Sequence, residues 1–156
     1  MDEITSTLGL DRFPPFYRDT RFLAALAAGA LFWLGLGLWE PIGTIPPGRL
    51  FSQRFIVLAF GWPLVEEFLF RGILQGELRR WSWGSRGWRG VTVANLATSF
   101  VFTALHFGSH PPLWAAGVMV PSLLFGYFRD RTSSVYPSMA LHVYYNFGYF
   151  FLTGLP

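Results

Sequence analysis

Long apolar stretches alternate with short polar segments along the chain. Each stretch is roughly 17 to 20 residues long, about the length that an α-helix needs to cross the hydrocarbon core of a bilayer. The five stretches are residues 22–39, 55–74, 91–108, 112–128 and 135–153. The pattern therefore predicts an all-α fold, a polytopic transmembrane helical bundle with about five spans.

The composition agrees with lipid as the solvent for most of the chain. Of the 156 residues, 52% are hydrophobic and only 13% are charged, and the mean hydropathy is +0.36. A soluble domain of this length needs more polar surface, so a soluble helical protein with an unusually large core is the weaker alternative. The chain starts with acidic Asp2 and Glu3 rather than a basic region. We therefore expect the first apolar run to stay in the membrane.

The basic residues also follow a membrane pattern. All 12 are Arg, and a five-span topology places two of them, Arg49 and Arg54, on one side and nine on the other. The nine are Arg12, Arg18, Arg21, Arg79, Arg80, Arg86, Arg89, Arg129 and Arg131. Because cytoplasmic loops carry the excess of positive charge, the N-terminus is predicted in the cytoplasm and the C-terminus outside. The Arg residues lie between apolar runs, so no nucleic-acid partner is expected.

Six polar side chains lie inside the apolar stretches, where each costs free energy. An ionisable group at the centre of a bilayer costs about 2.5 to 3.5 kcal/mol even on a lenient scale. The six are Glu66, Glu67, Arg71, His106, His142 and Asn146. Since mutual pairing or a wet cavity would lower this cost, we expect these side chains to converge.

The spacing of the two acids indicates different roles for them. Glu67 and Arg71 are four residues apart with the acid first, which favours an ion pair on one helix face. Glu66 lies roughly 100° around the same helix, so it is predicted to stay free for chemistry. The alternative is that Arg71 and a neighbour share both carboxylates. Pro63 removes a backbone hydrogen bond or starts a new helix just before the acids, with a packing role as its alternative.

The histidines are weaker signals when taken one at a time. His106 ends the third stretch, and a single histidine there is often a packing residue. His142 and Asn146 are four residues apart and project together, and such a pair can also serve as interhelical glue. His110 stands beside Pro111 and is interpreted as a loop residue outside the site.

Together these residues form three short motifs in a fixed order. The motifs are Glu66-Glu67-x-x-x-Arg71, Phe102-x-x-x-His106 and His142-x-x-x-Asn146. In this order and at these separations, they resemble the CPBP family of intramembrane proteases, which includes the CAAX prenyl endopeptidases and the Abi proteins. The similarity covers roughly residues 55–150 and includes Phe125-Gly126-Tyr127.

The resemblance implies a helical intramembrane protease of the glutamic type. By this likeness, Glu66 and His106 activate a water molecule, while His142 and Asn146 stabilise the oxyanion. Residues 1–156 would form a single integral membrane domain, with an N-terminal interfacial segment at 1–21 and the motif-bearing catalytic core at 55–153. The chain departs from many family members in having about one span before the motifs.

The residues themselves also agree with amide hydrolysis by an activated water. That reaction needs a base, for which Glu66 is suited, and hydrogen-bond donors that face the developing oxyanion. The chain has no Cys, which excludes a thiolate nucleophile and a Cys-based zinc site. A serine nucleophile is disfavoured because no Gly-x-Ser-x-Gly is present. No cofactor is therefore expected.

Other functions remain open at this stage. A zinc protease is the nearest alternative, because two His and a carboxylate can form an open metal site, although His-Glu-x-x-His is absent. A non-catalytic membrane scaffold or immunity protein, or a proton-coupled transporter, is also compatible with intramembrane carboxylates. The expected partners are a membrane-anchored protein or peptide substrate and the lipid bilayer. The sequence specifies neither the substrate nor the oligomeric state.

Overall fold

The computed structural model describes residues 3–39, 48, 50 and 52–155, and Arg49 therefore lies outside the described residues. The chain is mostly helical, which confirms the predicted fold class at this level. Its helices are α1 (Glu3–Leu8), the 3-10 helix η1 (Phe16–Arg18), α2 (Thr20–Trp39), α3 (Gln53–Ile56), η3 (Val57–Gly61), α4 (Trp62–Glu67), η4 (Phe68–Leu74), α5 (Gln75–Arg80), α6 (Val93–His106), α7 (Pro112–Gly117), α8 (Met119–Thr132) and α9 (Tyr136–Thr153).

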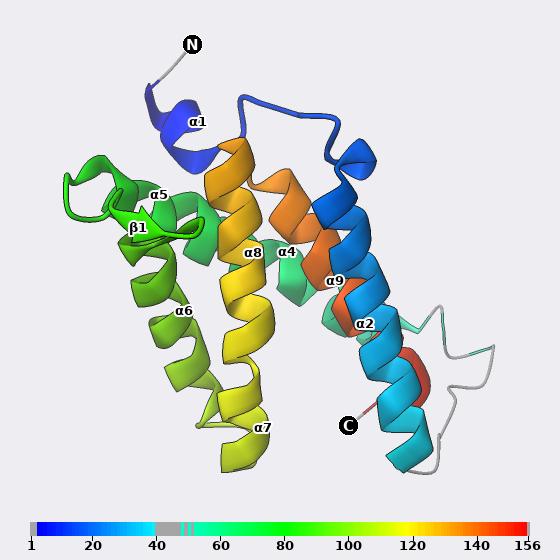
Figure 1. Ribbon diagram of the computed structural model, residues 1–156. Helices are drawn as coiled ribbons and strands as arrows, with labels where there is room; N and C mark the ends of the chain where they lie inside the picture. The colour runs from blue at the N-terminus through cyan, green and yellow to red at the C-terminus, as the bar shows by residue number, and fades with distance from the viewer. Residues whose placement is uncertain (1–2, 40–47, 49, 51, 156) are drawn as a thin grey trace.

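The helices run up and down through the molecule in five passes (Figure 1). The chain descends through α2, rises through α3 to α5, descends through α6, rises through α7 and α8, and descends through α9. Each pass coincides with one of the five predicted apolar stretches. α8 packs against both α6 and α9, and α9 also contacts α2 and α4. The central position of α8 and α9 brings residues from distant motifs together.

The second pass is not a regular α-helix along its whole length. Its backbone stays helical from Gln53 to Arg80, but η3 and η4 are π-helices, with hydrogen bonds from each N–H to the carbonyl five residues earlier. Pro63 lies at the start of α4, directly after η3. Proline has no N–H to donate, so a helical hydrogen bond is missing at this position. The hydrogen-bond pattern thus changes next to Pro63, where the sequence predicts a break.

Two further differences concern the third and fourth predicted stretches. Residues 91–92 do not begin the third helix but form strand β2 (Val91–Thr92), which pairs antiparallel with β1 (Gly87–Trp88). The turn between the strands uses Arg89 and Gly90, both with positive φ (52° and 87°), as a tight two-residue hairpin requires. The fourth pass is divided into α7 and α8 at Val118, whose backbone remains close to helical.

Aromatic and aliphatic side chains from α2, α8 and α9 form the main apolar core. Its buried members are Phe22, Ala25, Phe125, Phe128 and Leu141. Two glycines allow α2 and α9 to approach closely. A Cβ at Gly148 would collide with the Trp33 ring, and one at Gly29 would come within 2.6 Å of the Tyr145 ring. Small residues at helix contacts have this role in membrane proteins generally.

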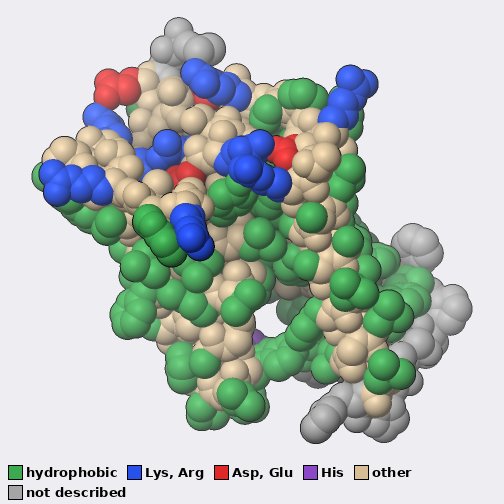
Figure 2. All heavy atoms as spheres, viewed as in Figure 1, with side chains coloured by type: hydrophobic (Ala, Val, Ile, Leu, Met, Phe, Trp, Pro, Cys, Tyr) green, Lys and Arg blue, Asp and Glu red, His purple; other side chains and the backbone are tan. Residues whose placement is uncertain are grey.

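The face of the molecule shown in Figure 2 has a polar end and a mostly apolar remainder. Figure 2 shows the Arg, Asp and Glu side chains gathered near α1, α5 and the hairpin, with mostly hydrophobic side chains below them. The outer face of α2 is strongly apolar, with Leu38 91% exposed. Within the described ranges, one helix has both the length and the composition to cross a membrane, at Thr20–Leu38, and α6 is apolar but shorter.

Candidate active site

The ion pair expected from the four-residue spacing forms at the centre of the molecule. Arg71 Nη1 donates to Glu67 Oε1 over 3.0 Å, and both side chains are completely buried. Arg71 Nη2 donates to the Ser122 hydroxyl (2.7 Å) and carbonyl (3.0 Å) on α8. The guanidinium also lies 4.7 Å from the centre of the Phe102 ring. Arg71 therefore joins η4 to α4, α6 and α8.

His142 connects the fifth pass to both acids. Its Nδ1 lies 2.8 Å from Glu67 Oε1, and its Nε2 lies 3.7 Å from Glu66 Oε2. Because an ionised carboxylate only accepts hydrogen bonds, we assign the Nδ1 proton to the bond with Glu67. The Phe125 ring stacks on the imidazole with centres 4.9 Å apart. These contacts orient the imidazole, and its second nitrogen faces Glu66.

Glu66 differs from Glu67 in facing a pocket rather than the buried ion pair. Its side chain is 29% exposed, while that of Glu67 is buried. The pocket has a volume of about 240 Å³ and lies between η4, α6 and the turn after α6. It is lined by Glu66, Phe70, Phe102, Leu105, His106, Ser109 and His110. The two acids thus lie in different surroundings: Glu67 is paired with Arg71, and Glu66 lies beside a cavity and 3.7 Å from His142.

His106 lies at the end of α6 with one nitrogen occupied by its own helix. Nδ1 lies 2.8 Å from the carbonyl of Phe102, so this nitrogen carries the donated proton and Nε2 remains an acceptor. The Phe102 ring packs against His106 with centres 4.6 Å apart and against Phe70 at 4.9 Å. The four-residue spacing of Phe102 and His106 thus places the ring under the imidazole and beside Arg71.

Asn146 follows His142 by one turn of α9 but does not line this pocket. Its amide Nδ2 donates to the carbonyl of Leu58 on η3 over 3.4 Å, and its side chain is half-buried. The structure therefore brings five of the six predicted residues into one connected group, with Asn146 at the neighbouring end. In the described part of the chain, no three His, Cys, Asp or Glu side chains are grouped closely enough to hold a metal ion.

Three residues of this region were not identified from the sequence as site residues. His110, interpreted as a loop residue, lines the pocket and stacks on His106 with ring centres 5.7 Å apart and 18° between the planes. Its N–H donates to the carbonyl of His106, so the turn continues the helical path. The spacing of four residues between His106 and His110 was the sequence feature that could have predicted this contact. Ser122 had no comparable signal, since it acts through a contact between distant segments. Phe125 belongs to the Phe125-Gly126-Tyr127 segment of the resemblance, but its stacking on His142 was not predicted.

Comparison with known proteins gives one family-level match. The model of the Rce1-like family, described as type II CAAX prenyl endopeptidase Rce1-like, matches residues 48–148. This range contains all three motifs and the whole pocket. A search of curated proteins and a search of solved structures each returned no match. The match confirms the resemblance to CPBP proteases, and the chain belongs to the Rce1-like family of type II CAAX prenyl endopeptidases.

Proposed function

We propose that this protein is an intramembrane endopeptidase that hydrolyses a peptide bond of a membrane-associated protein or peptide. Membership of the Rce1-like family supports proteolysis at the family level. The observation that supports the mechanism best is the division between the two acids. Glu67 is bound by Arg71, whereas Glu66 shares a pocket of about 240 Å³ with His106.

In the proposed reaction, Glu66 is the general base. Its carboxylate takes a proton from a water molecule in the pocket, and the resulting hydroxide attacks the carbonyl carbon of the substrate. His106 orients this water, because its Nε2 can accept a hydrogen bond while Nδ1 is held by the carbonyl of Phe102. Glu66 then returns the proton to the leaving amine. No other nucleophile is required.

The oxyanion is proposed to form near α9. His142 donates to it from Nε2, which lies 3.7 Å from Glu66 Oε2 and needs its own proton, because the Nδ1 proton is used in the bond to Glu67. Asn146 donates from its amide, after exchanging the long bond to Leu58 for one to the oxyanion. In a water-poor site such donors stabilise developing negative charge strongly.

We further propose that all five helical passes lie in the bilayer. The apolar faces of the passes and the gathering of charged side chains at one end support this arrangement (Figures 1 and 2). The substrate would then reach Glu66 from within the membrane, anchored by a lipid group or an apolar segment. A prenylated C-terminal peptide is the first substrate to test, because the family description names that class.

The test compares two substitutions that remove one charge each. Glu66→Gln should abolish cleavage of a prenylated CAAX peptide, or of another membrane-anchored peptide that the wild type cleaves, while leaving the melting temperature nearly unchanged. Glu67→Gln is the matched control, because it leaves Arg71 buried beside a neutral amide. Breaking a buried pair in this way costs about 3 to 5 kcal/mol, so this variant should lose stability and abundance.

One result for the Glu66→Gln variant would contradict the proposed mechanism. Full cleavage by a well-folded Glu66→Gln protein would show that Glu66 is not the general base. A non-catalytic scaffold of the same family would then be favoured, since a scaffold tolerates loss of a pocket-facing carboxylate. Turnover is measured per folded molecule in detergent, so that a change in abundance is not mistaken for a change in chemistry.

A further inference from the structure

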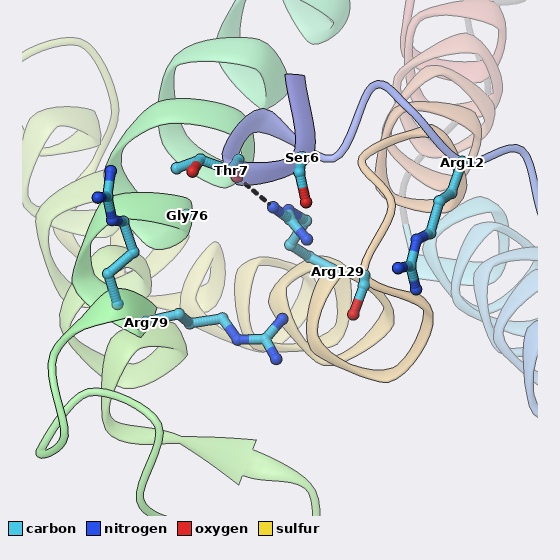
Figure 3. Close-up of a pocket in the computed structure, with 8 residues that line it drawn as sticks. Ser6, Thr7, Arg12, Gly76, Arg79 and Arg129 are labelled. Carbon is cyan, nitrogen blue, oxygen red and sulfur yellow. Dashed lines mark hydrogen bonds between the residues drawn. The ribbon is translucent and has the colours of Figure 1, made fainter. Parts of the chain in front are cut away.

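A second pocket lies at the polar end of the molecule, between α1, α5 and the C-terminal end of α8. Its volume is about 290 Å³. Four arginines line it, Arg12, Arg79, Arg80 and Arg129, together with hydroxyl side chains that include Ser6 and Ser133. Figure 3 shows the guanidinium groups of Arg79 and Arg12 on opposite sides of Arg129. No acidic residue is among the lining residues.

Arg129 is the unusual member of this group. It is only 3% exposed, and its hydrogen bonds go to backbone carbonyls, from Nε to Arg71 (3.0 Å) and from Nη2 to Thr7 (2.6 Å). No described carboxylate forms an ion pair with it. Burial, and then repulsion from Arg79, lower the pKa of Arg129 from its ordinary value to about 10. Asp130 and Asp11 attract this charge without forming a direct ion pair with it, so an anion that accepts hydrogen bonds from the guanidinium itself would stabilise it further.

The other arginines of the pocket each have a carboxylate partner. Arg80 pairs with Glu3 and Glu77, at 2.7 and 3.4 Å. The Nε of Arg79 lies 3.2 Å from Asp130. The partner of Arg12 is Asp11, at 3.8 Å. The four guanidinium groups thus have four carboxylates nearby, and what distinguishes the pocket is the number of guanidinium donors that line it rather than a net charge.

We propose that this pocket binds a phosphate group, carried by the headgroup of an anionic phospholipid or by free phosphate. Guanidinium groups donate paired hydrogen bonds that match phosphate oxygens, and serine hydroxyls add single donors. The position of the pocket favours a headgroup. Trp81 and Trp88, in the segment after α5, are 61% and 73% exposed, and exposed Trp side chains are typical of the level of lipid headgroups.

The test measures binding by the full-length protein in nonionic detergent micelles. Wild-type protein is titrated with short-chain phosphatidylglycerol and, separately, with inorganic phosphate, and the melting temperature is followed at constant ionic strength. Binding should be saturable. Arg12→Gln and Arg79→Gln should each weaken it at least tenfold. Arg86→Gln is the matched control, because Arg86 is exposed outside the pocket and should change binding less than twofold.

Each outcome has a definite meaning. Binding of phosphatidylglycerol alone identifies a headgroup site, and binding of both ligands shows that free phosphate suffices. Absence of saturable binding by the wild type, or equal binding by the Arg12 and Arg86 variants, overturns the proposal. The Arg12 variant keeps the test decisive if Arg79→Gln does not fold, since the Arg12 side chain is 62% exposed. The result is independent of proteolysis and does not rest on the proposed function.

Discussion

At the scale of single residues, one carboxylate oxygen organises the site. Glu67 Oε1 accepts hydrogen bonds from Arg71 on the same helical pass and from His142 on the last pass, at 3.0 and 2.8 Å. Arg71 in turn donates to Ser122. Removing Glu67 would therefore disturb both the helix contacts and the orientation of His142. Glu66 does not take part in this ion pair. Its substitution should therefore affect cleavage without lowering the stability of the fold.

The proposed role of Asn146 predicts a kinetic effect rather than a structural one. Removing one oxyanion donor typically lowers kcat by about 10² to 10³. Asn146→Ala should show a loss of this order with little change in KM, since the bond is made in the transition state. Asn146→Asp, which keeps the shape and loses the amide donor, should be similarly impaired. A lower melting temperature with unchanged kcat would instead show that Asn146 only stabilises the contact between helices.

The absence of a metal requirement is also a residue-scale prediction. If Glu66 and His106 alone activate the water, protein treated exhaustively with a chelator should retain its activity and contain no stoichiometric zinc by elemental analysis. A zinc mechanism would require His106, His142 and a carboxylate to move together as ligands. Activity that is lost on chelation and restored by zinc would establish that alternative.

At the scale of elements, Asp19 both caps α2 and connects it to α8. Its Oδ1 accepts from the N–H of Arg21, and its Oδ2 accepts from Arg131 Nε, each over 2.8 Å. The first contact satisfies one of the free N–H groups at the start of a helix. The second joins the N-terminal end of α2 to the C-terminal end of α8. One carboxylate thus fixes how two helices meet at the polar end.

This double contact predicts a pH-dependent stability difference. The hydrogen bond from Arg131, and then that from the Arg21 amide, lower the pKa of Asp19 from its ordinary value. A lowered pKa contributes stability above the ordinary value of about 3.9 and loses it as pH falls through the folded-state pKa. Asp19→Asn should therefore melt slightly below the wild type at pH 7, and the difference should disappear in acid.

The partner residue provides the control for this measurement. Arg131→Gln removes the same ion pair from the other side and should show the same convergence with wild type at low pH. Melting temperatures recorded in detergent between pH 7 and pH 3 are sufficient. A difference that stays constant over this range would show that the ion pair does not contribute to stability.

The elements also show what the sequence could and could not predict. Apolar length located all five passes, and the four-residue spacing predicted the Glu67–Arg71 pair. The contact between Glu67 and His142 joins residues 75 positions apart, and no spacing rule relates them. The π-helices were missed because hydrophobic patterns identify apolar length but not a change in backbone hydrogen bonding. Only Pro63 marked the first of them.

At the scale of the whole molecule, the charged side chains on the face shown in Figure 2 gather at the end that carries α1, α5 and the hairpin. The five passes alternate in direction, so the C-terminal end of α9 lies away from this end (Figure 1). An excess of Arg is typical of the cytoplasmic side of a membrane protein. The arrangement therefore favours a cytoplasmic polar end and a C-terminus on the other side.

Reporter fusions test this orientation. A reporter placed near Ser85, in the Arg-rich segment after α5, should report a cytoplasmic location, and one placed after Pro156 should report the outside. The two positions are separated by three of the proposed spans. Reporters found on the same side of the membrane would contradict the five-span arrangement.

The π-helix at Phe68–Leu74 has a consequence for insertions and deletions. A π-helical turn holds one residue more than the α-helical turn it replaces, so this segment resembles an α-helix that has gained a codon. Loss of a codon before Arg71 would shorten its separation from Glu67 and draw the guanidinium away from Ser122. Loss after Arg71 would turn Gln75 away from the Gly126 carbonyl that it now binds. The contacts of Arg71 and Gln75 therefore depend on the number of residues between Glu67 and Gln75, separately from which amino acids these are.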